Sequence, residues 1–380
     1  MIPAVLLPFA VAVVAPLLHR LRPRWTRGVL SLLPAGIAAW LLSVAPDVAA
    51  GESLTHSSSW IPALGLDLTL RLDGLGLLFA LLIAGIGLLV FVHAGGYLRD
   101  RADLGRFYAY LSLFMGSMLG LVMADNLLLL FVFWEATSVA SYLLIGFDHR
   151  REAARDAARH SLIVTGLGGV ALLAGVLLLG SMTGTYELSR LIGSGLVGEA
   201  GAVRWWAMGL ILVGALSKSA QFPFHFWLPR AMEAPTPASA YLHSSTMVTA
   251  GVYLIARLHP LFGGLAGWRL ALLTIGGVTA AAGAVIAFRQ TVLKRLLAYS
   301  TVSALGFTVM MLGLGSTAGA KAALTFLVAH ALYKSVLFLS VANLTAYTGS
   351  KDAEEASAPF RIAPLLAAAG ALGAAAMAGL

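Results

Sequence analysis

Three ionisable side chains stand inside apolar stretches of this sequence that are long enough to cross a membrane. Glu135 lies in NLLLLFVFWEATSVASYLLIGF, Lys218 follows an uncharged apolar run, and Lys334 lies in TFLVAHALYKSVLFLSVANL. Ionisable residues at such depth are costly, and they commonly mark the route of a proton or an ion. An acid and two bases can also exchange a proton with one another. These residues therefore predict proton or cation translocation.

Histidines extend this set. His330 precedes Lys334 by four residues, so the two share one face of a helix. His243 comes early in another apolar segment, and imidazole titrates near neutral pH. We predict proton transfer through the following residues: Glu135, Lys218, His243, His330 and Lys334.

Static roles remain open for several of these residues. Glu135 could be held in a permanent ion pair or stay protonated, and Lys218 could extend its four-carbon stem to the membrane interface. His243 could be a packed, hydrogen-bonded residue. His225, which is flanked by aromatic residues, could line a cavity or belong to an aromatic belt at the membrane surface.

A helix break is predicted beside Lys218. Pro223, in SKSAQFPFHFWLPRAM (217–232), lacks a backbone N–H, and its ring clashes with the carbonyl four residues earlier. Backbone groups freed at membrane depth are tolerated only where protein or water satisfies them. We therefore expect a hydrated cavity near the membrane midplane, a construction that transporters use.

The composition indicates an integral membrane protein. Of the 380 residues, 59% are hydrophobic and 11% are charged, whereas soluble domains carry about 25% charged residues. Continuous apolar runs of about 18–20 residues predict membrane-spanning helices. Cysteine is absent, and we expect no metal site and no cofactor. The formal charge of +8 fits arginines that set membrane topology, so we expect no nucleic-acid partner.

The predicted fold class is an all-α polytopic membrane protein with about twelve transmembrane helices. The chain is expected to form one membrane domain, 1–380, whose longest polar connections are 46–71 and 183–204. The predicted spans are 2–18, 28–45, 72–98, 107–123, 126–147, 160–182, 205–222 with a short continuation to about 233, 237–258, 268–288, 292–314, 319–347 and 360–380.

Basic residues predict the orientation of these spans. Of the 25 lysines and arginines, 17 fall in alternate connections that begin with residues 19–27. Because cytoplasmic loops are enriched in lysine and arginine, we expect this set of loops to face the cytoplasm. The N-terminus is then outside.

Four stretches resemble the antiporter-like membrane subunits, a family shared by the proton-pumping arm of complex I and by Mrp-type multisubunit Na⁺/H⁺ antiporters. They are 218–258 (KSAQFPFHFWLPRAMEAPTPASAYLHSSTMVTAGVYLIARL), 131–147 (FVFWEATSVASYLLIGF), 291–307 (TVLKRLLAYSTVSALGF) and 59–87. Within the family, 59–87 and FPFHFWLP look most like the large subunits of the Mrp branch. The resemblance implies about fourteen core spans, with broken helices near spans seven and twelve.

Mapped onto this chain, the family fold makes the first three spans peripheral. Residues 107–258 are expected to form a first antiporter-like half and 268–380 an incomplete second half. The sequence stops at Leu380, where the resemblance places the first part of the broken twelfth span. The sequence therefore looks truncated, and the family's last titratable residue is absent from it.

The resemblance also implies roles for individual residues. Glu135 and Lys218 would form a pair whose making and breaking controls the affinity of the lysine for its proton. His243 would lie between two half-channels, and Lys334 would be the central lysine of span eleven. Each of these residues matches the family pattern at its own position.

Three other positions bear on the comparison. Lys294 matches a basic residue with a proposed role in the antiporters, and a cytoplasmic topology charge explains it equally well. Thr249 stands where some relatives have a lysine, which puts a basic relay at that position in doubt. Gly169 stands where complex I relatives tend to carry an acid, so it favours the Mrp branch.

We therefore expect an ion-translocating subunit of a Na⁺/H⁺ antiporter in a bacterial cytoplasmic membrane, which is a secondary transporter and not an enzyme. Its partners would be other small hydrophobic subunits, protons, Na⁺ or another monovalent cation, and the lipid bilayer. One alternative is the distal proton-pumping subunit of complex I or a related redox-driven complex. Another is a structural scaffold whose channel is vestigial.

Overall fold

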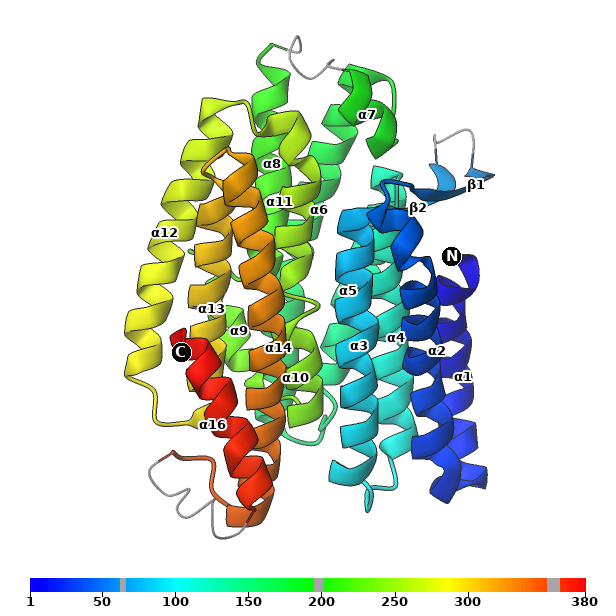
Figure 1. Ribbon diagram of the computed structural model, residues 1–380, viewed down its shortest axis with the longest axis vertical. Coiled ribbons are helices and arrows are strands. Elements are labelled where there is room, and N and C mark those ends of the chain that lie inside the picture. The colour runs from blue at the N-terminus through cyan, green and yellow to red at the C-terminus, as the bar shows by residue number, and fades with distance from the viewer. Residues whose placement is uncertain (62–65, 195–200, 354–362) are drawn as a thin grey trace.

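The computed structural model describes residues 1–61, 66–194, 201–353 and 363–380. In this part of the chain, most helices run along the long axis of one bundle (Figure 1). Nine of the described helices are long and apolar enough to cross a membrane. They are α1 (Ile2–Leu21), α2 (Pro23–Ala49), α3 (Gly74–Tyr97), α4 (Leu104–Met123), α5 (Leu127–Ile145), α6 (Glu152–Thr183), α12 (Ala266–Phe288), α13 (Leu293–Leu312) and α14 (Thr317–Thr348).

The other predicted spans correspond to shorter helices. α8 (Val203–Lys218) has 16 residues and so rises about 24 Å, less than the ~30 Å hydrocarbon core. α16 (Pro364–Ala378) has 15 residues, and residues 360–362 of its predicted span lie outside the described residues. The predicted multi-pass helical fold is confirmed, whereas the count of twelve spans is not.

Span eight is the clearest correction. We predicted one helix over 237–258, but the structure has two, α10 (Thr236–Ser244) and α11 (Thr249–Phe262). The residues between them, 245–248, leave the helical path at a buried position. Span seven is broken as predicted, but the helix ends earlier than predicted. α8 ends at Lys218 and not at residue 222 before Pro223, and the chain continues through short turns and α9 (Trp227–Arg230) to Glu233.

Polar side chains and glycines define several helix ends. Asp73, Asn126 and Ser316 each accept a hydrogen bond from the first turn of the helix that follows, which satisfies backbone donors that lack an intrahelical partner. Gly184 and Gly349 end α6 and α14 with φ of 72° and 75°, the left-handed conformation that glycine adopts readily.

The polar connection 46–71 contains a β-hairpin that we did not predict. Strand β1 (Leu54–Ile61) pairs antiparallel with β2 (Leu66–Leu72). The signal was present in LDLTLRL, where leucine alternates with polar residues at the period of a strand. Leu70 and Leu72 are buried, so the hairpin closes over the end of the bundle that also carries the N-terminus (Figure 1).

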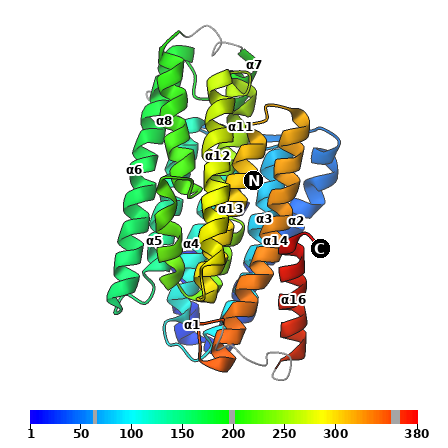
Figure 2. The ribbon, with the colours of Figure 1, turned by 90° about the vertical axis from the view of Figure 1, so that its left-hand side faces the viewer.

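The helices pack in neighbouring pairs. α1 packs against α4 and α2 against α3, while α12 packs against α13 and α16 against α14. Figure 1 shows α1 and α2 at one side of the bundle and α12 at the other, and Figure 2 shows the bundle from the side of α12. We call the end that carries the loops around 98–103, 146–151 and 289–292 the basic end, because arginines gather there.

An ion pair joins α3 to the second half of broken span eight. Arg257 on α11 donates hydrogen bonds to both carboxylate oxygens of Asp73, and its Nη2–Oδ1 distance is 2.9 Å. The same guanidinium donates to the hydroxyl of Tyr253, which donates in turn to the carbonyl of Val122 on α4. Burial raises the pKa of Asp73, but the hydrogen bonds and charge of Arg257 outweigh burial and hold that pKa below its ordinary value.

Arg257→Met should therefore destabilise the protein. The substitution leaves the Asp73 carboxylate, whose side chain is only 26% exposed, without its cation, and breaking a buried pair costs about 3 kcal/mol. Thermal unfolding in lipid nanodiscs measures the loss. Arg99→Met is the matched control, because the Arg99–Asp100 pair is 77% and 94% exposed and such pairs contribute little. Equal melting temperatures for the two variants would contradict this prediction.

Candidate functional site

Lys218 ends α8 and is completely buried. Its ammonium donates to the carbonyl of Trp134 at 2.6 Å and to the hydroxyl of Ser138 at 2.9 Å. The same nitrogen lies 4.6 Å from the centroid of the Trp134 ring, within the range of a cation–π contact. Lys218 therefore points into α5, and neutral groups hold it there.

Glu135 neighbours this ammonium but does not pair with it. The two charges are close enough to interact electrostatically, yet among the described residues no ion pair of 4.0 Å or less joins them. Glu135 Oε1 is buried and has no hydrogen-bond partner there. The structure thus places the predicted acid and base together with their pairing contact open.

Glycine on α6 makes room for the Glu135 carboxyl group. A Cβ atom added to Gly169 would lie 1.9 Å from Glu135 Oε1, and one added to Gly168 would lie 1.8 Å from the hydroxyl of Ser217. The backbone of α6 therefore approaches both the acid of α5 and the end of α8. The sequence singles out Gly169 only as a missing acid, and its contact with Glu135 is not predicted by it.

The break after Lys218 is held by hydrogen bonds. The indole of Trp227 donates to the carbonyl of Ser217 at 2.9 Å, and the hydroxyl of Ser219 donates to the carbonyl of Val248 at 2.7 Å. The backbone N–H of Phe222 donates to a threonine hydroxyl on α12. The side chains of Trp227 and of this threonine thus satisfy two backbone groups of the break, and Ser219 satisfies one of the span-eight break, as membrane depth requires.

Pro223 lies five residues after the end of α8 and leads into a 3₁₀ turn, Phe224–Phe226. His225 in this turn is half-buried and stacks on the ring of Phe222, with centroids 5.9 Å apart. Its Nδ1 is buried without a partner among the described residues. The structure does not bring His225 into contact with Lys218 or His243, so its role as a cavity or relay residue stays a prediction.

His243 lies in the last turn of α10 and is completely buried. Neither ring nitrogen has a hydrogen-bond partner among the described residues. Its ring centroid is 6.1 Å from that of Trp227, the residue that caps the break of span seven. An imidazole with both nitrogens unpartnered can accept and donate a proton through small polar molecules that enter the site.

A serine contact joins the broken span eight to α14, the helix that carries Lys334. Next to His243, the hydroxyl of Ser244 lies 2.8 Å from the hydroxyl of Ser335 on α14. Lys334 itself is buried and donates to the hydroxyl of Ser300 on α13 at 2.6 Å. Nδ1 of the neighbouring His330 lies 3.1 Å from the hydroxyl of Tyr333. The predicted histidine and lysine of span eleven are thus both buried.

Two remaining predicted residues make local contacts. Lys294 donates to the carbonyls of Met232 and Ala234 at 2.6 and 2.7 Å, so it holds the continuation of broken span seven. It also lines a pocket of 410 Å³ at the basic end. The hydroxyl of Thr249 donates to carbonyls of the span-eight break, at Ser245 and Thr246. Proton-transfer roles for Lys294 and Thr249 stay predictions.

His93 on α3 belongs to the same class of residue and was missed. Its Nε2 lies 3.0 Å from Oδ1 of Asn343 on α14, and its ring stacks on Tyr97. Its Nδ1 is buried and unpartnered within the described chain. His93 is an ionisable side chain inside an apolar run, the same sequence feature that selected Lys334. It lies only four residues from the end of its helix, however.

Sequence comparison identifies the family. A family model described as NADH:quinone oxidoreductase/Mrp antiporter, transmembrane, matches residues 124–380. The chain belongs to this family. A second model, described as the N-terminus of chain 5 of NADH-ubiquinone oxidoreductase (complex I), matches residues 60–108 of this family member.

Curated relatives of this antiporter-family chain cover almost all of it. A probable K⁺/H⁺ antiporter subunit of Rhizobium meliloti (strain 1021) is 43% identical over 379 residues, which are 99% of this chain and 38% of the relative. A Na⁺/H⁺ antiporter subunit of Alkalihalophilus pseudofirmus is 42% identical over 393 residues, 99% of this chain and 49% of the relative. The chain thus spans less than half the length of these relatives.

Solved structures share the fold. A chain of the Mrp complex from a Dietzia species matches with a TM-score of 0.91 and 38% identity, over 99% of this chain and 41% of its own length. A chain of the membrane-bound sulfane sulfur reductase, an archaeal respiratory complex, matches with a TM-score of 0.89 over 100% of this chain and 78% of its own. At 22% identity, the second likeness shows the fold alone.

Gly169→Ala should disturb the Glu135 carboxyl group, because the added methyl would overlap Oε1. Because this oxygen is the far end of a flexible side chain, the carboxyl group can move aside, and we expect a loss of about 1 kcal/mol, the low end of the range for overpacking. Gly166→Ala on the same helix is the matched control, since its Cβ would meet nothing within 4 Å and alanine favours a helix. Thermal unfolding of both variants measures the difference.

A double variant shows whether the carboxyl group is the cause. Glu135→Ala combined with Gly169→Ala should lose less stability than the sum of the single changes, because the colliding group is gone. Strict additivity of the two effects would show that Gly169 does not pack against Glu135.

Proposed function

We propose that this chain is the ion-translocating part of the large subunit of an Mrp-type Na⁺/H⁺ antiporter, a secondary transporter and not an enzyme. One observation carries the proposal. Lys218 and Lys334 are both buried, and each donates to a serine hydroxyl on a neighbouring helix, Ser138 or Ser300. A lysine whose hydrogen-bond partners are neutral can gain and lose its proton. A carboxylate fixed beside it would instead stabilise the protonated form.

Proton transfer would proceed through the predicted residues in the order of the fold. Opening and closing of the Glu135–Lys218 contact would load and release the lysine, since a nearby carboxylate favours the ammonium form. His243 would connect the first half to the second. The Ser244–Ser335 contact supports this order, because it places a hydroxyl chain between the neighbour of His243 and the neighbour of Lys334.

The chain would be organised in two antiporter-like halves, 107–258 and 268–380, beside three peripheral spans within one membrane domain, 1–380. The serine-held lysine that recurs once in each half supports this division. We place the protein in a bacterial cytoplasmic membrane, with the basic end in the cytoplasm and the N-terminus outside. The enrichment of arginine at the basic end supports this orientation.

The partners would be the other hydrophobic subunits of the antiporter complex, the lipid bilayer, protons and a monovalent cation. Relatives named for Na⁺ and for K⁺ exchange support a monovalent cation. A redox-driven complex of the complex I type is the competing assignment, favoured by the match of residues 60–108. Co-purification with flavin and iron–sulfur subunits would decide for it.

Lys218→Ala and Lys334→Ala should each abolish cation-dependent proton transport in everted membrane vesicles while the complex still assembles. The reason is that each change removes the titratable group that donates to Ser138 or Ser300. Lys321→Ala is the matched control, because Lys321 lies on the same helix as Lys334 but is exposed. Its transport rate should equal that of the unmodified protein.

Glu135→Gln keeps the shape of the side chain and removes its charge, so it should lower transport without loss of assembly. Full transport by the Lys218→Ala variant would refute the relay. Retention of transport after both Lys218→Ala and Lys334→Ala would instead favour a scaffold with a vestigial channel. Everted vesicles are first acidified inside, which quenches a pH-sensitive dye, and the recovery of its fluorescence on addition of NaCl or KCl measures each case.

A further inference from the structure

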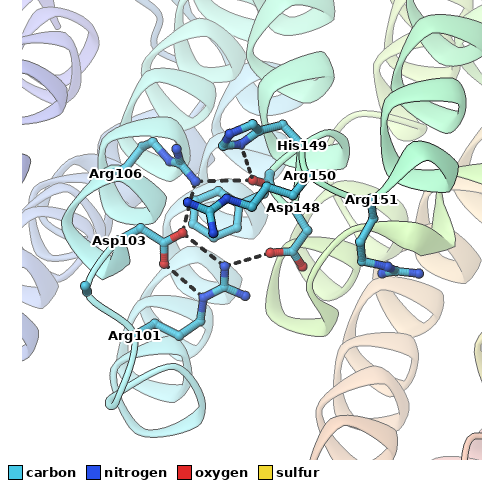
Figure 3. Close-up of a pocket in the computed structure, with 9 residues that line it drawn as sticks. Arg101, Asp103, Arg106, Asp148, His149, Arg150 and Arg151 are labelled. Carbon is cyan, nitrogen blue, oxygen red and sulfur yellow. Dashed lines mark hydrogen bonds and ion pairs between the residues drawn. The ribbon is translucent and has the colours of Figure 1, made fainter.

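A pocket of 650 Å³ opens at the basic end, between the α3–α4 connection and the α5–α6 connection (Figure 3). It shares no residue with the predicted proton route. Arginine dominates its lining, with four guanidinium groups against two carboxylates. The lining residues are Arg101, Ala102, Asp103, Arg106, Phe147, Asp148, His149, Arg150 and Arg151.

The carboxylates fix two of these arginines in place. Arg101 donates two hydrogen bonds to Asp103, at 2.9 and 3.0 Å, and one to Asp148 at 2.7 Å. Arg106 donates to Asp103 at 3.0 Å. The hydrogen bond from Arg101 is the main reason that the pKa of Asp103 lies below its ordinary value. Both guanidinium groups are therefore held in one orientation before any ligand arrives.

An aromatic ring completes this arrangement. The guanidinium carbons of Arg101 and Arg106 lie 5.1 and 4.7 Å from the centroid of Phe147, and Nε of Arg106 is buried without a partner in the described chain. Planar guanidinium groups with fixed positions suit a phosphate group, which they can bind through paired N–H donors. The positive excess of the pocket has the complementary charge.

A second pocket extends the first toward the membrane-spanning part of the bundle. It has a volume of 230 Å³ and shares Arg106, Phe147 and His149 with the arginine pocket. Its other walls come from α4, α5 and α6. These wall residues are Tyr110, Tyr142, Leu143, Gly146, Arg155 and Ala158.

The first pocket is lined mainly by charged side chains, and the second adds two tyrosines, a leucine and an alanine between the helices, so together they suit an amphiphile. A free phosphate ion would need only the arginines, and an acidic protein loop would gain nothing from a groove between membrane-spanning helices. Tyrosine is also common at the level of lipid headgroups. We propose that the two pockets bind one anionic phospholipid, with its phosphate among Arg101, Arg106 and Arg150 and an acyl chain along the α4–α5–α6 groove.

The site also touches the broken helix of span seven. Arg151 at the rim of the pocket lies 2.5 Å from a carboxylate oxygen of Glu233, which belongs to the 3₁₀ turn Ala231–Glu233. A bound headgroup would therefore lie beside the segment that Lys294 holds in place. This placement stands independently of the proposed transport function.

Lipid exchange tests the proposal. The purified antiporter complex is reconstituted in phosphatidylcholine nanodiscs that contain a small fraction of spin-labelled phosphatidylglycerol, and the immobilised fraction of the label is measured. Arg101→Gln combined with Arg106→Gln should weaken retention by roughly tenfold or more, because it removes the charged donors that would bind the phosphate. Arg159→Gln, an exposed arginine outside the pocket at the same end, should leave retention unchanged.

A groove variant separates the possible occupants. Leu143→Trp fills the second pocket without altering the arginines, so it should lower phosphatidylglycerol retention and keep any binding of inorganic phosphate. Unchanged lipid retention together with displacement by millimolar phosphate would overturn the proposal in favour of a small-anion site. A third outcome would also overturn the proposal. If the intact complex immobilises none of the label while its arginines are protected from chemical modification, a neighbouring protein of the complex occupies the pocket.

Discussion

The structure depends on holding two lysine ammonium groups inside a bilayer without a counter-ion fixed to either of them among the described residues. Lys218 and Lys334 are buried, and serine hydroxyls and a carbonyl take the place that a carboxylate would occupy in a static pair. Burial of an isolated charge is costly, so the surrounding helices must supply dipoles at set positions. The contacts of Lys218 with α5, and the packing of α14 against α13, are the means by which they do so.

The broken helices follow from the same requirement. A continuous helix uses all of its interior backbone groups, whereas an interrupted one presents carbonyls and N–H groups to its neighbours. Here the two interruptions face one another, because Ser219 of the first bonds to Val248 of the second. Trp227 and His243 lie at this junction, so the element that satisfies the break is also the one that contacts the central imidazole.

Sequence alone located the acid, the two lysines, the two central histidines and the first break, because each disturbs an apolar pattern. It missed the second break, since HSSTMV contains no proline and serine and threonine are compatible with a helix. It did not single out His93, which lies four residues from the end of its helix. Contacts such as Gly169 with Glu135 could not be predicted, because they depend on how closely two helices approach.

The contact between Ser244 on α10 and Ser335 on α14 has fewer hydroxyl hydrogens than hydrogen-bonding contacts. Ser244 and Ser335 carry two hydroxyl hydrogens, yet their oxygens lie in hydrogen-bonding contact with each other and with the carbonyls of Ala240 and Ala331. Three contacts therefore compete for two hydrogens, and one contact is always empty. Rotation of both hydroxyls moves the empty contact from the carbonyl of Ala331 to the carbonyl of Ala240 while every heavy atom stays in place, and it reverses the direction of the hydrogen bond between the two serines.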